Sequence, residues 1–456
     1  MNRFRSVWNS LFAQPVLARD LSLFRLVYCG SLAAVHATQI PRLGHLYDSF
    51  HSVYFPIPSF EWLGLDKLPF AIAQCCNVAL LVALVLAACG LLVRVALLAA
   101  VVTFFLYYGT ILGFEKPWPN SVSPYTFHYN NLVCFTLLIL AVAPKSTWHA
   151  EPRIPRWPLR LVELSMALAY FGSGYAKLRA SGLLWADGHT LQGHLLLLHL
   201  QEDAAFGLWI AQHYWVCVIL GVATLAFELT FIVVPFLPRD SRVRWMYVCG
   251  GVIFHGAIAV AMRITHFLPY MGLSYLVFVH WSRASIVWGR GGASAAEVPD
   301  ASRPVGVGPW AGAFICGLVS VLVLCIVWRV EFWPFSDYGV FVGRSHYSRV
   351  CAGRLQGVTA SGERNWINPR EVGPGFKGWY DGTNFRRFLD SHARRPARDE
   401  KDRTVELLTA YYGHLPERTR AKYQGLAYVQ RCIVRRPDGS LASEDRILAT
   451  SRATSP

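Results

Sequence analysis

The residues best able to do acid–base chemistry lie in one apolar segment of the sequence, residues 160–185. Glu163, Tyr170 and Lys177 follow one another there at intervals of seven residues. On a helix such residues drift by only about 20° per step, so the three side chains share one face. Ser173 adds a small polar side chain to that face, four residues before Lys177. A lysine held in a partly dry pocket can lose its proton and act as a base.

The composition is that of an integral membrane protein. Of the 456 residues, 54% are hydrophobic and 16% are charged, whereas soluble domains carry about 25% charged residues. The net charge of +15 suits nucleic-acid binding or basic loops that orient a membrane protein, and the apolar composition favours the loops. We therefore expect the lipid bilayer as a partner and no nucleic acid. The eleven cysteines show no zinc-binding spacing, and no P-loop or HExxH motif occurs, so no metal is predicted.

Nine apolar segments are long enough, or nearly long enough, for the roughly 20 residues that cross a bilayer as a helix. The fold class that they predict is an all-α polytopic membrane protein with about nine transmembrane helices. The segments are residues 21–39, 70–92, 94–114, 128–144, 158–180, 214–237, 244–262, 268–287 and 309–330.

Basic residues fall in alternate connections between these segments. Arg94 lies between the second and third segments, Lys145 between the fourth and fifth, and Arg239 between the sixth and seventh. The positive-inside rule makes this side cytoplasmic, with the N-terminus inside and the C-terminus outside. We expect a bacterial inner-membrane protein with three parts: a cytoplasmic segment (residues 1–20), a helical bundle (21–330) and an extracytoplasmic region (331–456).

The extracytoplasmic region differs in character from the bundle. It is rich in turn signals such as Pro374-Gly375, and its short alternating runs predict strands beside a helix, hence a small α+β appendage. Cys351 and Cys432 are its only cysteines. They form a disulfide candidate because an oxidising compartment lets such thiols pair. Two free thiols are the alternative.

Several polar side chains are expected at the depth of Lys177, in the outer half of the membrane. A charged residue at the centre of a spanning helix costs about 2.5–3.5 kcal/mol, so such residues are rare and often functional. The fourth and seventh segments supply the other members of this pocket, which we expect to be His128, Asn130, Asn131, His255, Arg263 and His266. The alternatives are a Lys177 that extends its ammonium group to the membrane surface and histidines that only bond a neighbouring helix.

A second group of charges is expected towards the inner half of the membrane. It contains Arg25, Glu163 and Glu228. The simplest interpretation is a structural ion pair between Arg25 and either glutamate, which would fix the register of the helices.

Six stretches of the sequence match the motifs of a known family in the right order. They are DLSLFRLVYCGSL, GLLVRVALL, FHYNNLVCFTLLIL, YFGSGYAKLRASGLLWADGHTL, FHGAIAVAMRITHFLPYMGLSY, and FWPFSDYGVF with the later WINP. In these stretches the sequence resembles the HTTM (horizontally transferred transmembrane) domain of the vitamin K-dependent gamma-carboxylase family. The resemblance covers residues 18–370, and YFGSGYAKLRASGLLWADGHTL is the closest match.

The resemblance implies an enzyme with carbon–carbon lyase and monooxygenase chemistry. In this family, reduced vitamin K is oxygenated to its epoxide, and the strong base so generated removes a glutamate γ-proton before carbon dioxide adds. The lysine that starts the reaction matches Lys177, and a family histidine that matches His255 would orient the quinone oxygen. The implied cofactor is reduced vitamin K or another quinol, and the implied partner is a peptide or small glutamyl substrate. Tyr170 joins the expected quinol pocket.

Two departures from the family pattern keep a second function open. Animal members usually have two successive lysines where this sequence has Ala176 and Lys177, and their region after the last helix is much longer. The alternative is a non-enzymatic HTTM-family protein with a maturation, immunity or scaffold role. A secondary transporter would show paired broken helices or inverted repeats, and the sequence shows neither.

Overall fold

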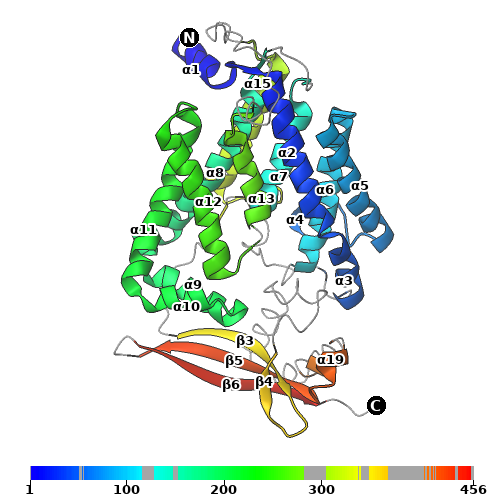
Figure 1. Ribbon diagram of the computed structural model, residues 1–456, viewed down its shortest axis with the longest axis vertical. Coiled ribbons are helices and arrows are strands. Elements are labelled where there is room, and N and C mark those ends of the chain that lie inside the picture. The colour runs from blue at the N-terminus through cyan, green and yellow to red at the C-terminus, as the bar shows by residue number, and fades with distance from the viewer. Residues whose placement is uncertain are drawn as a thin grey trace, which may run out of the picture.

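The protein is a helical bundle with a β-sheet across one end (Figure 1). The N-terminus lies at the end of the bundle that is remote from the sheet. The fold is taken from a computed structural model. It describes residues 2–452 except 51–53, 55, 116–127, 147–152, 266, 282–304, 337, 340–348, 368–404, 406–407, 410–411, 414, 416 and 437–439.

A helix lies in each of the nine segments that were predicted to span the membrane. Among the described residues, five helices are long and apolar enough to cross it, which makes this a predominantly helical membrane protein. These five are α5 (Phe70–Cys89), α6 (Val93–Glu115), α11 (Tyr214–Thr230) with its continuation η2 (Phe231–Phe236), α12 (Arg242–Met262) and α15 (Pro309–Trp328).

The other four helices in predicted segments are shorter or carry more charge. Two are short: α7 (His128–Val142), and α13 (Phe267–Ser274) with η3 (Tyr275–Phe278). The other two, α2 (Ala18–Ala37) and α8 (Trp157–Ser181), contain ionisable residues that lower their hydropathy.

The helix α8 is the centre of the bundle. Most of its 25 residues are buried, including Arg160, Glu163 and Lys177. The helix packs against α7, α11, α15 and η2, so these three charged side chains face other parts of the protein and not lipid. This burial on all sides explains why its residues show no amphipathic pattern.

Short elements hold the two ends of α8. At its start, β1 (Pro15–Leu17) pairs antiparallel with β2 (Arg153–Pro155) and ties the helix to the N-terminal α1 (Asn2–Phe12). At its end, η1 (Gly182–Ala186) leads into α9 (His189–Glu202) and α10 (Ala205–Gln212). Figure 1 shows α9 and α10 lying between the bundle and the sheet.

The sheet has four antiparallel strands in the order β4-β3-β5-β6. Cys351 and Cys432 are directly opposite each other on β3 and β5, and a disulfide joins them. In the rung next to this disulfide, Val350 and Ile433 are opposite each other and pack with leucines of α9, so the sheet is held against the bundle. The strands are β3 (Arg349–Val358), β4 (Arg364–Trp366), β5 (Gly425–Arg435) and β6 (Leu441–Arg452); the short helices are α3 (Ile40–Phe50), α4 (Pro58–Trp62) and α19 (Glu417–Arg420).

Candidate functional site

A cavity of about 180 Å³ lies among α8, α9, α10, α11, α12 and α13. Most of its wall is aliphatic or aromatic, as in pockets that bind small apolar molecules. The polar side chains on this wall are few, and they come from four helices and from the segment after α15. They are Tyr170, Ser173, Lys177, His194, Thr224, Glu228, His255 and Tyr338.

Lys177 is completely enclosed at this cavity, with 2% of its surface exposed. Its Nζ donates to both carboxylate oxygens of Glu228, each at 2.8 Å, and to Ser173 Oγ at 2.7 Å. The ring of Trp185 lies 5.2 Å from Nζ and covers the ammonium group. Lys177 therefore does not extend to the membrane surface but forms a buried ion pair.

The packing of α8 against α11 makes this ion pair possible. The helices run antiparallel, and each long side chain leans towards the N-terminus of its own helix. Lys177 and Glu228 therefore lean towards each other. Gly174 allows the close approach, because a Cβ atom there would lie 3.0 Å from Glu228 Cβ and 3.1 Å from Leu229 Cγ.

The predicted role of Glu228 in the inner charge layer is wrong for this reason. The backbones of Glu228 and Lys177 lie at different depths along their helices. The two side chains lean towards each other and close that gap. Glu228 bonds Lys177 and Ser173, both on α8. Counting residues along each span gives the depth of Cα atoms and misses the reach of the side chains.

A second polar group on the cavity wall is centred on His255. Its Nε2 is 2.6 Å from the hydroxyl of Tyr170, which also hydrogen-bonds the hydroxyl of Tyr275. The imidazole stacks on Phe267, with ring centroids 5.6 Å apart. Its Nδ1 is buried and has no hydrogen-bond partner. Buried polar atoms are normally paired, so this nitrogen is an unused hydrogen-bonding group on a residue that lines the cavity.

Gly251 makes room for the hydrogen-bonded chain. A Cβ atom at this position of α12 would lie 1.8 Å from the hydroxyl of Tyr275. Any side chain at residue 251 would therefore push Tyr275 away from Tyr170. Tyr275 was not among the predicted site residues, and only its place in the matched stretch that ends GLSY marks it in the sequence.

Of the remaining residues of the predicted outer pocket, those whose side chains the structure describes do not line this cavity. Asn130 and Asn131 are buried on α7, where their amide groups have no hydrogen-bond partner. Arg263 ends α12 in a left-handed conformation and is exposed. The side chain of His128 and the whole of His266 lie outside the described residues. The predicted pocket thus contains Lys177, Tyr170 and His255 in one place and the two asparagines in another.

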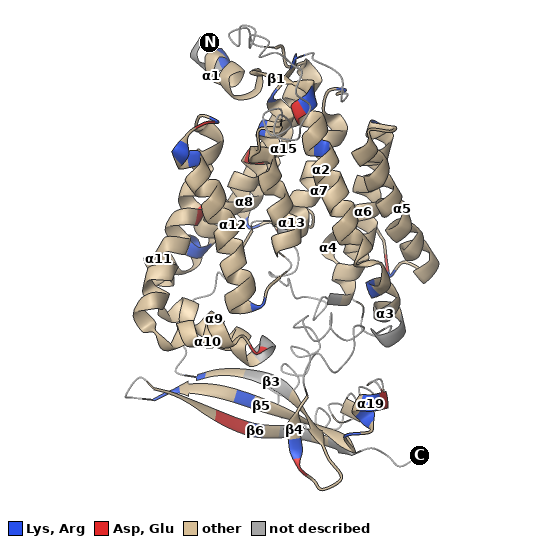
Figure 2. Ribbon diagram, in the orientation of Figure 1, with Lys and Arg blue, Asp and Glu red and all other residues tan. Residues whose placement is uncertain are grey.

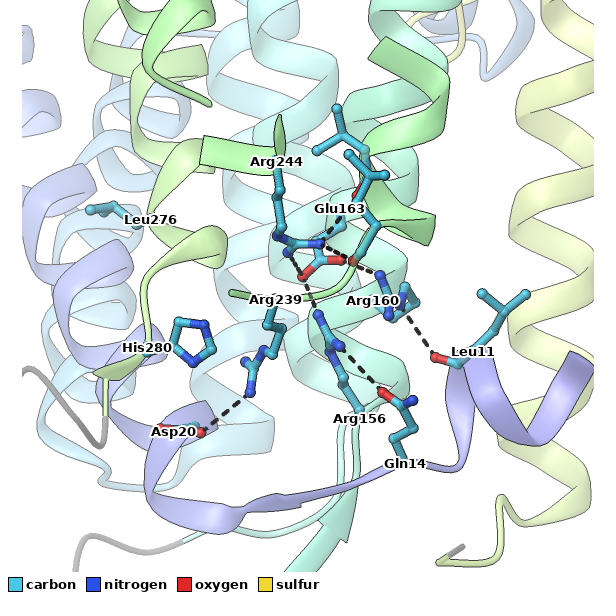
Figure 3. A network of polar contacts seen from close by, with 12 residues as sticks. Leu11, Gln14, Asp20, Arg156, Arg160, Glu163, Arg239, Arg244, Leu276 and His280 are labelled. Carbon is cyan, nitrogen blue, oxygen red and sulfur yellow. Dashed lines mark hydrogen bonds and ion pairs between the residues drawn. The ribbon is translucent and has the colours of Figure 1, made fainter. Parts of the chain in front are cut away.

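Three arginines surround Glu163 near the start of α8 (Figure 3). Arg156 and Arg244 each reach Oε1, at 2.9 and 2.7 Å, and Arg160 reaches Oε2 at 2.8 Å. Glu163 has no exposed surface. It therefore belongs to a buried structural cluster, the arginine cluster, which contains these four residues.

Main-chain carbonyls at helix ends balance the excess positive charge. Arg244 donates to the carbonyl of Val234 at 3.2 Å, near the end of η2, and Arg160 donates to the carbonyl of Leu11, near the end of α1. The C-terminal end of a helix carries partial negative charge, which attracts cations. Burial and the neighbouring Arg156 lower the pKa of Arg239, which lies outside the spans beside this cluster, to about 10, so it stays charged.

Arg25 pairs with neither glutamate, so its predicted ion pair is wrong. Its Nε donates to the carbonyl of Ala87 at 3.1 Å, and its Nη1 donates to Ser146 Oγ at 3.2 Å. The reason is position: α2 packs against α5, and Arg25 meets the C-terminal turn of that helix. A helix end can therefore take the place of a carboxylate as the partner of a buried arginine.

Comparisons of the chain with protein-family models, curated proteins and solved structures find no match. Among the described residues, no group of three or more His, Cys, Asp or Glu side chains is arranged to hold a metal ion. The cavity therefore offers acid–base and hydrogen-bonding groups from the chain itself: the Lys177–Glu228 pair and the free nitrogen of His255.

Glu163→Gln is expected to lower the free energy of unfolding by about 3–5 kcal/mol, because it leaves three buried arginines without their carboxylate. Denaturant unfolding of the protein in mixed micelles measures this change. The matched control is Glu444→Gln, whose partner Arg349 is exposed, with 53% and 55% side-chain exposure for the arginine and glutamate. The control should cost less than about 1 kcal/mol. Equal effects of the two variants would contradict a structural role for the arginine cluster.

Proposed function

We propose that this protein is a membrane-embedded enzyme that acts on a quinol, in the manner of the vitamin K-dependent gamma-carboxylases that its sequence resembles. One observation carries the proposal. Lys177 and His255, the two residues that the resemblance connects with the quinol, come from different helices and line the same cavity. Tyr170 supports it further, because its hydroxyl fixes the imidazole of His255.

The chemistry of the cavity wall suits a quinol. A quinol is a flat apolar ring with hydroxyl groups, and the cavity is apolar with two separate polar groups on its wall. The free Nδ1 of His255 would hold one oxygen. Lys177 would meet a hydroxyl proton, with Glu228 and Ser173 holding its ammonium group in place. When bound, reduced vitamin K or a related quinol supplies the oxidation chemistry that the resemblance implies, with carboxylation of a peptide or small glutamyl substrate as its outcome.

A second candidate is a non-enzymatic HTTM-family protein with a maturation, immunity or scaffold role. The observation that favours it is the complete pairing of Lys177, whose three donors are all used by Glu228 and Ser173. A lysine that only locks two helices together would have the same contacts.

The proposal includes nine transmembrane helices, a cytoplasmic N-terminus and an extracytoplasmic C-terminal region in a bacterial inner membrane. The helix in each of the nine predicted segments supports the count. The basic residues Arg94, Lys145 and Arg239 in alternate connections support the orientation. Figure 2 shows lysines and arginines at the end of the bundle that carries the N-terminus and also on the sheet. The disulfide between Cys351 and Cys432 supports an oxidising compartment for the sheet.

The purified protein is expected to convert vitamin K hydroquinone to its epoxide in the presence of oxygen and to fix labelled bicarbonate on a glutamyl peptide. Product analysis by chromatography and scintillation counting measures both reactions. Formation of the epoxide without incorporation of the label would support the quinol chemistry and contradict the carboxylase activity. No epoxide, under conditions where a known carboxylase is active, would contradict the enzyme and leave the scaffold role.

Lys177→Ala is expected to reduce epoxide formation by at least about 100-fold, the lower end of what a positioned base contributes. The matched control is Lys422→Ala, on the exposed surface beside the sheet, which should retain full activity. Size-exclusion chromatography must first show that both variants are folded, because Glu228 loses its partner in Lys177→Ala. An active Lys177→Ala variant would show that the lysine is only structural.

Single cysteines introduced on opposite sides test the orientation in intact cells. Ser361→Cys, at the exposed turn between β3 and β4, should react with an impermeant thiol reagent. Asp240→Cys, at the exposed connection before α12, should be protected until the cells are permeabilised. Protection of residue 361 together with labelling of residue 240 would reverse the proposed orientation.

A further inference from the structure

The ion pair raises a question of proton balance that the proposed function leaves open. An ammonium group that is paired with a carboxylate already carries its full set of protons, so it cannot accept another. We infer that Glu228 accepts a proton from Lys177, which lets Lys177 take the proton of the bound hydroxyl group, so that the pair acts as the base. This inference rests on the proposed function, since it names how the same site receives a proton.

The geometry of the pair supports transfer along it. Lys177 Nζ is 2.8 Å from both oxygens of Glu228, which is a normal distance for a charge-assisted hydrogen bond. Both side chains line the cavity, so a bound hydroxyl group reaches the pair without crossing another element. Ser173 Oγ lies 2.7 Å from Nζ and 3.2 Å from Glu228 Oε1, so it holds the two groups in register.

The proton count balances within the pair. Lys177 transfers one N–H proton to Glu228, which breaks an N–H bond and forms the O–H bond of a neutral carboxylic acid. Lys177 then takes the proton of the bound hydroxyl group, whose O–H bond breaks and whose electron pair stays on oxygen. The site ends with an ammonium group, a neutral carboxylic acid and an ionised oxygen.

Charge conservation favours this route in an apolar cavity. The resting pair has zero net charge, and the products also sum to zero, with the ammonium group beside the ionised oxygen. An unpaired charge in such surroundings would cost several kcal/mol. A lysine with no acidic partner would have to be neutral before the reaction in order to remove the hydroxyl proton.

Other titratable side chains also face this cavity, and the test must separate them from Glu228. His255 and Tyr170 bond each other, and the latter also bonds Tyr275. A carboxylic acid has a spectroscopic signature that none of these rings shares. The groups on or behind the wall are Tyr170, Lys177, His194, Glu228, His255, Tyr275 and Tyr338.

The experiment uses the purified full-length protein in detergent and the monomethyl ether of a naphthohydroquinone as the probe. This ether keeps one hydroxyl group and cannot be oxidised to the quinone. Infrared difference spectra on adding the probe should show the C=O stretching band of a new protonated carboxylic acid. Ultraviolet absorbance should show the ionised probe in the same sample.

Three variants assign the band to a residue. Glu228→Gln should lose the carboxylic acid band and at least about 100-fold of epoxide formation, while still binding the probe. Glu228→Asp should keep a band at a shifted frequency, so the inference stays testable if the glutamine variant does not fold. Glu444→Gln, on the exposed strand β6, should give the spectrum of the unchanged protein.

The outcomes distinguish the inference from the proposed function. Binding of the probe without a carboxylic acid band, or a band that persists in Glu228→Gln, would overturn the role of Glu228 and leave quinol binding intact. Failure of the unchanged protein to bind the probe would overturn the proposed function itself. Appearance of the band without epoxide formation from a full quinol would support Glu228 as acceptor and remove only the oxidation chemistry.

Discussion

The constraint on which the rest of this structure depends is the cost of charge on a helix that other helices surround. α8 carries Glu163 near its start and Lys177 near its end, and both are almost completely buried. A buried charge without a partner is strongly destabilising, so each of them fixes the position of a neighbouring segment. Glu163 binds Arg244 of α12, and Lys177 binds Glu228 of α11. The two levels together set how these helices pack.

The arginine cluster and the Lys177–Glu228 pair differ in how their charges are matched. This difference makes the first structural and lets the second take part in proton transfer. At the arginine cluster, one carboxylate meets three arginines, and helix-end carbonyls accept further hydrogen bonds from Arg160 and Arg244. Proton transfer there would leave several positive charges without their carboxylate. At Lys177 one cation meets one anion, so a proton can move within the pair at constant net charge. Lys177 and Glu228 line the cavity described above, whereas none of the four residues of the arginine cluster is part of its wall.

Much of this arrangement follows from sequence patterns, and the part that does not depends on side-chain reach. A helix lies in each of the nine segments that apolar length predicted, and the seven-residue spacing put Tyr170 and Lys177 on one face. The partners predicted for Arg25 and Glu228 were wrong, because counting residues along a helix gives only the depth of its backbone. A main-chain carbonyl such as that of Ala87 leaves no signal in the residue types, so no sequence argument points to it.

Glycine sets the distance on which the Lys177–Glu228 pair depends. At Gly174 any Cβ atom would sit against the Cβ atom of Glu228, at 3.0 Å, so a larger residue would force α11 away from α8. The neighbouring side chain would have to give way by a few tenths of an ångström, and a hydrogen bond weakens as it lengthens beyond its normal range. The proton-transfer geometry is therefore a product of backbone packing. Gly174 permits this packing but takes no part in the chemistry. In the sequence it is only one of several small residues in the stretch that contains Lys177.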